Sequence, residues 1–504
     1  MAAVSRGLAA AIFISLFAGA AVAQSRSLDA EVERLIASKR LGNATVGICI
    51  RDVDNATSLA GVRENTPMTP ASNMKILTSG AALMVLSPSF SFRTELIQDG
   101  DRLIVRGAGD PALADPEVLD SMSPRMTVGD VLDALAGAAA KAGITSAREL
   151  VIDDRVFDRQ FTHPSWAADK LDKGYAAQIA GLNFHANVLA VFPRPAQTIG
   201  APPAYAIQPE APWLRLENKA RTVAAGKNSV WISRDGNTNR FTLHGDVRFP
   251  VQVGAEITVN DPPRFFGSIL ASELEKKGIT IGAAPSAPGT EPAAVRLAEG
   301  ADPVSGGRVI AAVSTPIAEV LHRCNTDSAN LYAESLLKRI GNTVTHESGS
   351  WANGAAVLRM LLAQKLGPDA ASSVIIADGS GLSREDAVSP GVMARWLEVL
   401  ARDPQLCDTF TNSLAVPGKG TLKTRFQGAR LKNQIFAKSG YINGVRSLSG
   451  YVVNPESGRR VAFSVIVNDV NDGQAAAAKE LHEDVVRLCD RWLADRTDTP
   501  KQGG

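Results

Sequence analysis

The chain has 504 residues, of which 45% are hydrophobic and 21% are charged. It can therefore bury a sizeable core, it is too long for one ordinary domain, and it lacks the long one-sign charge runs of disordered chains. The formal net charge is only +1, which gives no electrostatic basis for binding nucleic acid.

The first 23 residues are typical of a secretory signal peptide. Arg6 precedes an apolar stretch over residues 7–20, and Ala21-Val22-Ala23 is a small-x-small cleavage pattern. The stretch is shorter than the ~20 residues of a spanning helix. Removal of Arg6 with this segment leaves 52 basic and 52 acidic side chains. We therefore expect a periplasmic protein with at most a loose membrane association; a retained membrane anchor is the alternative.

The elements after the signal peptide alternate between helix and strand. Apolar residues recur with helical spacing from Leu28, which predicts a helix that ends near Gly42. Two strands are expected between residues 45 and 61, with a turn at Asp54-Asn55. Pro70 suits a helix entry, and an apolar helical run continues to about residue 86. Ser72 is therefore expected on the first turn of that helix.

The middle of the chain has a different character. Residues 92–309 hold short strand-like runs, many glycines and prolines, and one clear helix near residues 128–143. We interpret this segment as one or two β-rich modules inserted between the first and second parts of another domain. That domain is expected to comprise residues 24–91 and 310–495, and residues 496–504 a flexible tail.

Regular elements resume near residue 309. Asp327 and Ser328 can cap a helix to about residue 340, with Gly341 past its end. Three strands follow, at 433–441, 445–453 and 460–468, and then a final helix. This order predicts an α+β fold with a five-stranded antiparallel sheet, terminal helices over one face and an all-helical subdomain beside it.

Ser72-Asn73-Met74-Lys75 places a hydroxyl and an amine three residues apart, on one face of a helix. A serine is a poor nucleophile unless a base activates it, and an amine can serve if burial or another cation lowers its pKa. The pattern alone is weak, because it recurs at Ser335-Leu336-Leu337-Lys338. We interpret the second copy as a solvated helix face.

Two further motifs follow in the chain. Ser328-Ala329-Asn330 is an S-x-N at a helix start, where plain capping is the alternative. Lys438-Ser439-Gly440 lies on a strand, where glycine permits close backbone approach and an exposed lysine is the alternative. The order S-x-x-K, S-x-N, K-[ST]-G is that of penicillin-binding proteins and class A β-lactamases.

The spacing makes the resemblance more specific. The first serine precedes the second by 256 residues, and Ser328 precedes Lys438 by 110. The long first gap resembles the serine D-Ala-D-Ala carboxypeptidase/endopeptidase family, the class C low-molecular-mass penicillin-binding proteins similar to penicillin-binding protein 4, in which a large insertion separates the first two motifs. The resemblance covers nearly the whole mature chain. Further short stretches match the family: Gly109 to Leu113, Ser328 to Glu334, Asp378 to Arg384, Gly420 to Leu422 and Leu448 to Tyr451.

The resemblance implies a penicillin-binding, β-lactamase-like catalytic domain and a mechanism without metal ion or organic cofactor. Ser72 would form an acyl-enzyme at the penultimate D-Ala, and Lys75 would accept its proton. Peptidoglycan stem peptides and β-lactams would be the ligands; the oligomeric state stays open. The remaining implied residues are Ser328 and Lys438 for proton relay, Asn330 for amide contact or Lys75 orientation, Ser439, Gly440 and Tyr441 along the substrate, Arg384 for the diamino acid and, more weakly, Asp153 and Phe157.

Some positions depart from the family. Ala329 stands where Asp is frequent, Ser439 where Thr is frequent, and Tyr441 is bulkier than the usual small hydroxyl residue. A β-lactamase or esterase on the same scaffold and a non-catalytic peptidoglycan-binding protein remain alternatives. A Ser-His-Asp hydrolase has little support because no G-x-S-x-G elbow accompanies the six histidines. The four cysteines lack C-x-x-C spacing, which argues against zinc, and their disulfide pairing is left open.

Overall fold

The computed structural model describes residues 28–287, 289–302 and 306–497. The predicted signal peptide and the end of the predicted tail lie outside the described residues. The chain forms two compact units. Unit 1 comprises the described residues up to Met84, His322–Ser328, and those from Leu358 onward; unit 2 comprises Val85–Leu321 and Ala329–Val357. The predicted insertion boundaries at 92 and 309 stay a prediction.

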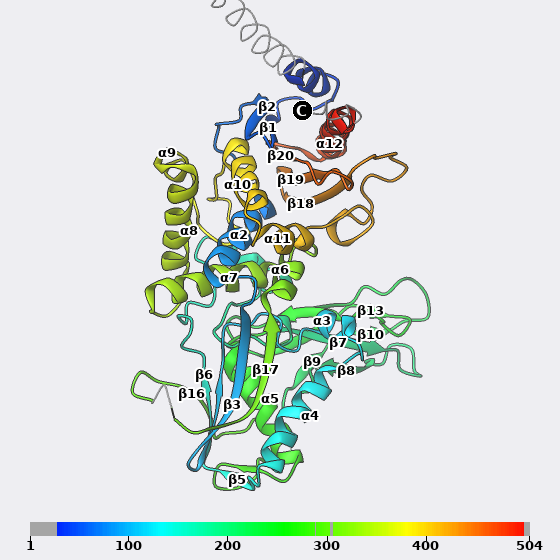
Figure 1. The fold of residues 1–504 in the computed structure, drawn as a ribbon. Coiled ribbons are helices and arrows are strands. Elements are labelled where there is room, and N and C mark those ends of the chain that lie inside the picture. Colours follow the sequence, from blue (N-terminus) through cyan, green and yellow to red (C-terminus); the bar gives the residue numbers. More distant parts are fainter. Residues whose placement is uncertain (1–27, 288, 303–305, 498–504) are drawn as a thin grey trace, which may run out of the picture. The chain divides into compact units, whose positions relative to one another are not determined.

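A five-stranded sheet forms the centre of unit 1 (Figure 1). Its order is β18-β19-β20-β1-β2, and every neighbouring pair is antiparallel, which confirms the predicted sheet. Chain ends far apart in sequence meet where β20 pairs with β1. The strands are β1 (Thr45–Asp52), β2 (Thr57–Val62), β18 (Gln434–Ile442), β19 (Val445–Val453) and β20 (Arg460–Asn468).

Helices cover both faces of this sheet. The helix over residues 28–37 and α12 (Ala475–Thr497) bury their apolar sides on one face, as the sequence predicted. On the other face lie α2 (Met74–Leu86) and α10 (Pro390–Arg402). Tyr451 of β19 donates a hydrogen bond to Leu397 O, and Trp396 donates one to Ile76 O. These bonds fix α10 between the sheet and α2.

The shorter helical elements of unit 1 connect these layers. The division into units falls near the end of α2 and within α6 (Ile317–Asn325) and α8 (Trp351–Leu366). None of the helices in the described part of the chain combines the length and apolar character that crossing a bilayer would require. The remaining elements of unit 1 are η1 (Ala71–Asn73), α9 (Pro368–Ser372), α11 (Cys407–Ser413), η5 (Gly420–Leu422) and η6 (Asp472–Gln474).

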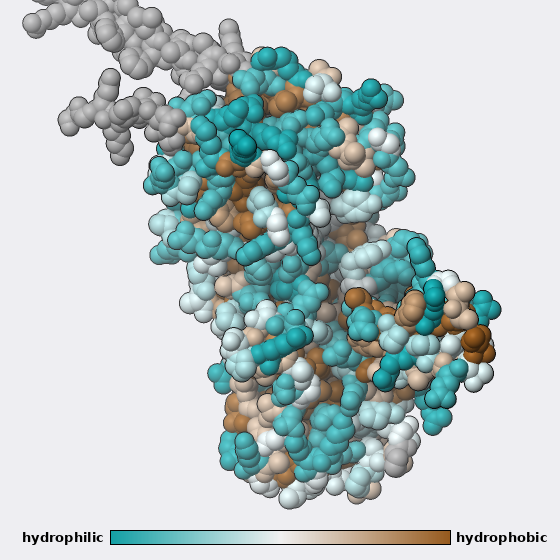
Figure 2. Space-filling model, turned by 90° about the vertical axis from the view of Figure 1, so that its right-hand side faces the viewer, coloured by the Kyte–Doolittle hydropathy of each residue, from teal (hydrophilic) through white to brown (hydrophobic). Residues whose placement is uncertain are grey.

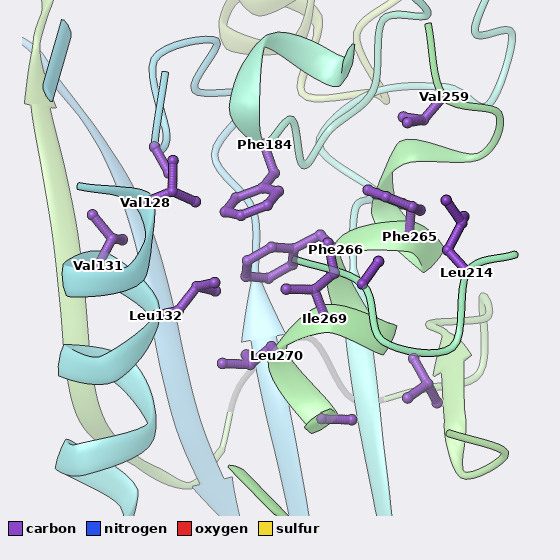
Figure 3. Close-up of a cluster of buried hydrophobic side chains, with 14 of the residues drawn as sticks. Val128, Val131, Leu132, Phe184, Leu214, Val259, Phe265, Phe266, Ile269 and Leu270 are labelled. Atoms are coloured by element: carbon purple, nitrogen blue, oxygen red, sulfur yellow. The ribbon is translucent and has the colours of Figure 1, made fainter. Parts of the chain in front are cut away.

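Unit 2 is built on a mixed five-stranded sheet of order β16-β6-β4-β3-β17. Figure 3 shows side chains of α4 (Val128–Lys141) and α5 (Pro262–Lys276) directed into one shared core. Hydrophilic residues dominate the visible surface (Figure 2). The strands are β3 (Ser91–Asp99), β4 (Arg102–Arg106), β6 (Glu149–Asp153), β16 (Val295–Leu297) and β17 (Arg308–Pro316).

The other strands of unit 2 form small sheets, and short helices accompany them. Residues 188–258 supply three of them, of orders β14-β7-β8, β11-β12-β9 and β10-β13, and β15 pairs with β5. The strands are β5 (Ser146–Ala147), β7 (Val188–Arg194), β8 (Ala204–Gln208), β9 (Leu216–Asn218), β10 (Arg221–Thr222), β11 (Trp231–Arg234), β12 (Phe241–His244), β13 (Asp246–Val247), β14 (Ala255–Thr258) and β15 (Thr280–Ile281). The helices are α3 (Pro116–Ser121), η2 (Ala168–Lys170), η3 (Gly174–Ala176), η4 (His185–Asn187) and α7 (Asn330–Thr345).

The predicted end of α7 is wrong. The helix runs on to Thr345 and ends at His346, which adopts a left-handed conformation. Gly341 lies inside the helix, and a Cβ there would overlap the side chain of Asn353. Gly341 is therefore needed because a neighbouring helix packs closely against it, and not because the chain turns there.

Candidate active site

Ser72 and Lys75 lie together at the start of the helical run. Ser72 is in η1, and α2 continues directly from Met74. The Lys75 Nζ atom is 3.1 Å from Ser72 Oγ and 2.8 Å from the carbonyl oxygen of Ser380. Lys75 is fully buried, whereas Ser72 is partly exposed. The hydroxyl is thus accessible to a substrate while the amine is not.

The loop after Asp378 holds the Ser380 carbonyl in place. Asp378 Oδ1 accepts hydrogen bonds from the N–H groups of Ser380 and Gly381, and Oδ2 accepts one from Ser383. A Cβ at Gly381, whose φ is +78°, would overlap Ala71 O. The loop therefore packs directly against the segment that carries Ser72, and only glycine fits there.

Asp386 lies behind this loop and was not predicted. It is almost fully buried, and its Oδ1 accepts hydrogen bonds from the N–H groups of Ala377 and Asp378. Burial, and then the neighbouring Asp378 carboxylate, raise its pKa well above the usual range. Burial and the nearby negative charge thus both favour the protonated form of Asp386. The Asp-Gly-Ser-Gly stretch signals a turn at Asp378, but nothing in the sequence identifies Asp386.

Ser328 and Lys438 form a second hydroxyl–amine pair. Lys438 Nζ donates hydrogen bonds to Ser328 Oγ at 2.8 Å and to Ser439 O at 2.7 Å. Burial first, and the charge of Lys75 second, hold the pKa of Lys438 well below its usual range. The two amines therefore oppose each other's protonation. Ser328 does not act as the predicted helix cap: its φ is +66°, and Ala329 precedes α7 without a side-chain cap bond.

Strand β18 lies at the edge of its sheet and passes close to Ser72. A Cβ on Gly440 would come within 3.0 Å of Ser72 N and 2.9 Å of Pro70 O, and would overlap Ser447 Oγ. On the outer edge, Ala437 N–H bonds Ala415 O. Because alternate residues of a strand point the same way, the N–H groups of Ser439 and Tyr441 also face this edge. The edge thus offers donors beside Ser72.

The other predicted contact residues lie at several places. Ser439 is partly exposed, and Tyr441 is 67% exposed with the Arg446 guanidinium 4.1 Å from its ring centre. Arg384 is exposed and donates to Asn443 O, in the turn after β18. These residues belong to unit 1 with Ser72.

Three predicted residues belong to unit 2. Asn330 begins α7, and its amide donates to Tyr175 O at 2.7 Å. Asp153 forms an ion pair with Arg155 at 2.7 Å. Phe157 is 1% exposed and packs against Gly109. Asp153 and Phe157 are thus engaged in contacts within unit 2.

The interpretation of the second S-x-x-K as a solvated face is wrong. Ser335 and Lys338 are both fully buried in α7. Lys338 Nζ bonds Asp158 at 2.6 Å and lies 3.8 Å from the ring centre of Trp351, and Ser335 Oγ accepts from Asn183 at 3.4 Å. These contacts make the second copy a structural pair.

Neither a metal centre nor a disulfide is built into the described chain. Over those residues, no cluster of three or more His, Cys, Asp or Glu side chains is placed to hold a metal ion. The four cysteines are buried and form no disulfide. The side chains gathered at Ser72 are hydroxyls and amines, which suit acyl transfer.

The architecture and the site correspond to a known family of peptidases. A profile of the D-Ala-D-Ala carboxypeptidase 3 (S13) family matches residues 28–491. The chain belongs to this family. This S13 peptidase is 31% identical over 485 residues to the D-alanyl-D-alanine carboxypeptidase of Actinomadura sp. (strain R39), covering 92% of the chain and 84% of the relative. The resemblance inferred from the motifs is confirmed, and the protein is a serine-type carboxypeptidase.

Other relatives agree with this membership. The S13 peptidase is 26% identical over 459 residues to D-alanyl-D-alanine carboxypeptidase DacB of Haemophilus influenzae, covering 85% of the chain and 86% of the relative. The crystal structure of penicillin binding protein 4 (dacB) from Haemophilus influenzae superposes with a TM-score of 0.72 at 22% identity, covering 90% of this chain and 98% of the other. The two proteins share their fold.

Proposed function

We propose that Ser72 is the nucleophile with which this S13 peptidase hydrolyses the D-Ala-D-Ala end of peptidoglycan stem peptides, their D-Ala-diamino acid cross-links, or both. The observation that carries the proposal is the contact of Ser72 Oγ with the buried Lys75 amine at 3.1 Å. A nucleophile with a base in hydrogen-bond reach, and the base oriented by a third group, is the arrangement that covalent catalysis requires.

Acylation begins with proton transfer. A neutral Lys75 has two N–H bonds and one lone pair; with one N–H held by Ser380 O, the lone pair can face Ser72 Oγ. The Oγ–carbon bond forms as the hydroxyl proton passes to Lys75. The N–H groups of Ser72 and Tyr441 stabilise the developing oxyanion.

The leaving amine then takes a proton. Ser328 supplies it and is reprotonated through Lys438, which is bonded to Ser328 Oγ, by the proton that Lys75 accepted. Both amines therefore end the step with the protons they began with. The carbon–nitrogen bond breaks, and D-Ala or the cross-linking diamino acid departs as the amine. Water subsequently hydrolyses the ester and restores the Ser72 hydroxyl. The proton relay and the hydrolysis use only side chains and water.

The substrate binds as a strand along the edge of β18. An extended peptide adds to such an edge through main-chain hydrogen bonds. Ser439 helps to hold the terminal carboxylate, Asn330 the amide, and Arg384 the diamino acid. β-Lactams imitate the acyl-D-Ala-D-Ala carbonyl and acylate Ser72; a solved structure of the Haemophilus influenzae relative contains a β-lactam.

The chain contains a matched control for testing the nucleophile. Labelled penicillin is incubated with purified protein, Ser72→Ala and Ser335→Ala, and the label is followed after quenching. We expect Ser72→Ala to lose the label and Ser335→Ala to keep it, because each serine precedes a lysine by three residues but only Ser72 is proposed to react. Equal labelling of Ser72→Ala by a correctly folded protein would refute the proposal. Rapid loss of label from the parent would indicate a β-lactamase instead.

Products identify the bond that is cut. Purified peptidoglycan is digested and the fragments are resolved by mass. Loss of one D-Ala indicates carboxypeptidase action, and conversion of dimers to monomers indicates endopeptidase action.

The proposal includes export to the periplasm through cleavage after residue 23 and a catalytic domain interrupted by residues 92–309. N-terminal sequencing of the periplasmic protein tests the cleavage.

A further inference from the structure

Three loops of unit 2 combine into one surface, here named the apolar tip: residues 193–203, 221–230 and 247–254. Gly200 N–H bonds Thr222 O at 2.9 Å, which joins the first loop to the second. Asn228 Oδ1 accepts the N–H groups of Arg248 and Phe249, which joins the second to the third. The bond from Val251 N to Pro193 O closes the ring of contacts. The tip is therefore one hydrogen-bonded structure.

Large apolar side chains project from this tip. Ile199 is 66%, Phe249 54% and Val253 85% exposed. Single exposed apolar residues are normal on soluble proteins. Here Ile199 comes from the first loop and Phe249 and Val253 from the third, and the two loops are joined, so the three side chains form a group. Brown, hydrophobic residues are visible at the surface of unit 2 among teal ones (Figure 2). At these exposures the side chains stand out from the surface instead of lining a hollow.

The charge of the tip has one sign. Its three loops contain Arg194, Arg221, Lys227 and Arg248 and no Asp or Glu. Arg221 is paired with Asp246, just outside the tip, at 2.7 Å. The Arg248 guanidinium lies 4.7 Å from the ring centre of Phe249, so a cation and an aromatic ring are presented together. An apolar surface within a cationic rim complements an anionic one.

We propose that the apolar tip docks this peptidase on an anionic lipid bilayer, with Ile199, Phe249 and Val253 at the boundary between headgroups and acyl chains. Arg194, Lys227 and Arg248 then meet the lipid phosphates. Projecting apolar side chains flanked by cations are the chemistry of interfacial attachment. A bilayer needs no complementary shape, whereas a protein partner for three protruding side chains would need matching pockets. Docking would keep the enzyme on the side of the peptidoglycan that faces the membrane.

Vesicle co-sedimentation tests the proposal with the mature chain. Vesicles of phosphatidylcholine alone are compared with vesicles of three parts phosphatidylcholine to one part phosphatidylglycerol, at low and high salt. We expect binding only to the anionic vesicles, weakened by salt. Each neutralised cation should lower the affinity about fivefold, so Arg194→Gln/Lys227→Gln/Arg248→Gln should lose about 100-fold. Ile199→Ser/Phe249→Ser/Val253→Ser should lose at least about tenfold.

A control variant replaces equally apolar positions elsewhere on unit 2: Met122→Ser/Val309→Ser/Val344→Ser, all exposed. It should bind vesicles within about twofold of the parent, and penicillin labelling of all variants should be unchanged. Phe249→Ser alone serves if the triple tip variant melts early. Parent-like vesicle binding by a folded tip variant overturns the proposal. The proposal is also overturned if the tip variants bind vesicles like the parent but lose self-association, measured by sedimentation velocity, or lose binding to purified peptidoglycan.

Discussion

The amine of Lys438 donates a hydrogen bond to the hydroxyl of Ser328 across 2.8 Å. The amine is fully buried, and burial and the charge of Lys75 lower its pKa well below 10.5. An amine held in this state destabilises the fold, because the unfolded chain binds its proton more tightly. The relationship therefore links the proposed proton relay to a measurable cost in stability.

Replacing Lys438 with methionine should separate catalysis from stability. Loss of a general acid–base group is expected to lower the rate of acylation by penicillin about 10²–10⁴-fold. The folded pKa lies below the unfolded one, so the parent's stability rises with pH between the two values. The advantage of Lys438→Met in free energy of unfolding should thus be largest at low pH and vanish toward pH 10.5. Urea titrations at several pH values measure it; an advantage that grows with pH would contradict the assignment.

Asp378 is expected to act as a positioning residue for Lys75. Asp378→Asn replaces an acceptor of three backbone N–H bonds with an amide that can accept at only one atom. The loop should shift, and Ser380 O should no longer hold the Lys75 amine. We expect acylation to slow about 10–100-fold and stability to fall by ~2 kcal/mol.

A purely structural role for Asp378 makes a different prediction. It would lower the melting temperature but leave the acylation rate of the folded fraction and its pH profile unchanged. Stopped-flow labelling below the melting range distinguishes the two. Thr78→Val serves as the control. The Thr78 hydroxyl donates a hydrogen bond to Gly379 O in the same loop, so this variant loosens the loop without removing the Asp378 bonds that position Ser380 O.

Asp386→Asn tests the raised pKa of Asp386. The folded pKa of Asp386 is raised well above 3.8, so the folded protein binds the proton more tightly than the unfolded chain. The parent's stability contribution is full below about pH 4 and declines as the pH rises through the folded pKa. An asparagine amide at this position does not titrate. The variant's free energy of unfolding should therefore gain on the parent's as pH increases, and a pH-independent difference would exclude a proton on Asp386.

The sequence predicted the elements better than the contacts between them. Strands β1, β18, β19 and β20 lie within a residue or so of their predicted positions, because alternation and turns are local signals. The predicted end of α7 was wrong because Gly341 is required by its close contact with Asn353 of a neighbouring helix, not by a helix end. Ser335 and Lys338 were misjudged because local sequence cannot show that a helix is buried on this side by a tryptophan and an aspartate.

The residues of the site likewise include some that the sequence predicted and one that it did not. Motif order and the implied family brought Ser72, Lys75, Ser328 and Lys438 to attention, and all four lie in unit 1 with contacts of 2.8–3.1 Å within each hydroxyl–amine pair. Asp378 lies in a stretch that matches the family, but the buried Asp386 behind it was not predicted. Asp386 has no turn or motif of its own, and its role depends on folding back onto a residue eight positions earlier.

Gly440→Ala is expected to displace the β18 edge from the nucleophile. The new methyl group would overlap Ser447 Oγ and come within 3.0 Å of Ser72 N and 2.9 Å of Pro70 O. Overpacking of this kind costs about 1–3 kcal/mol, and a shift of about 1 Å between Tyr441 N–H and Ser72 should slow acylation about 10²-fold. Removing the Ser447 hydroxyl in Gly440→Ala/Ser447→Ala relieves the worst overlap, so the double variant should recover part of both losses compared with Ser447→Ala alone. If the two substitutions are additive in acylation rate and in free energy of unfolding, the close packing of β18 on the Ser72 segment is not what the glycine provides.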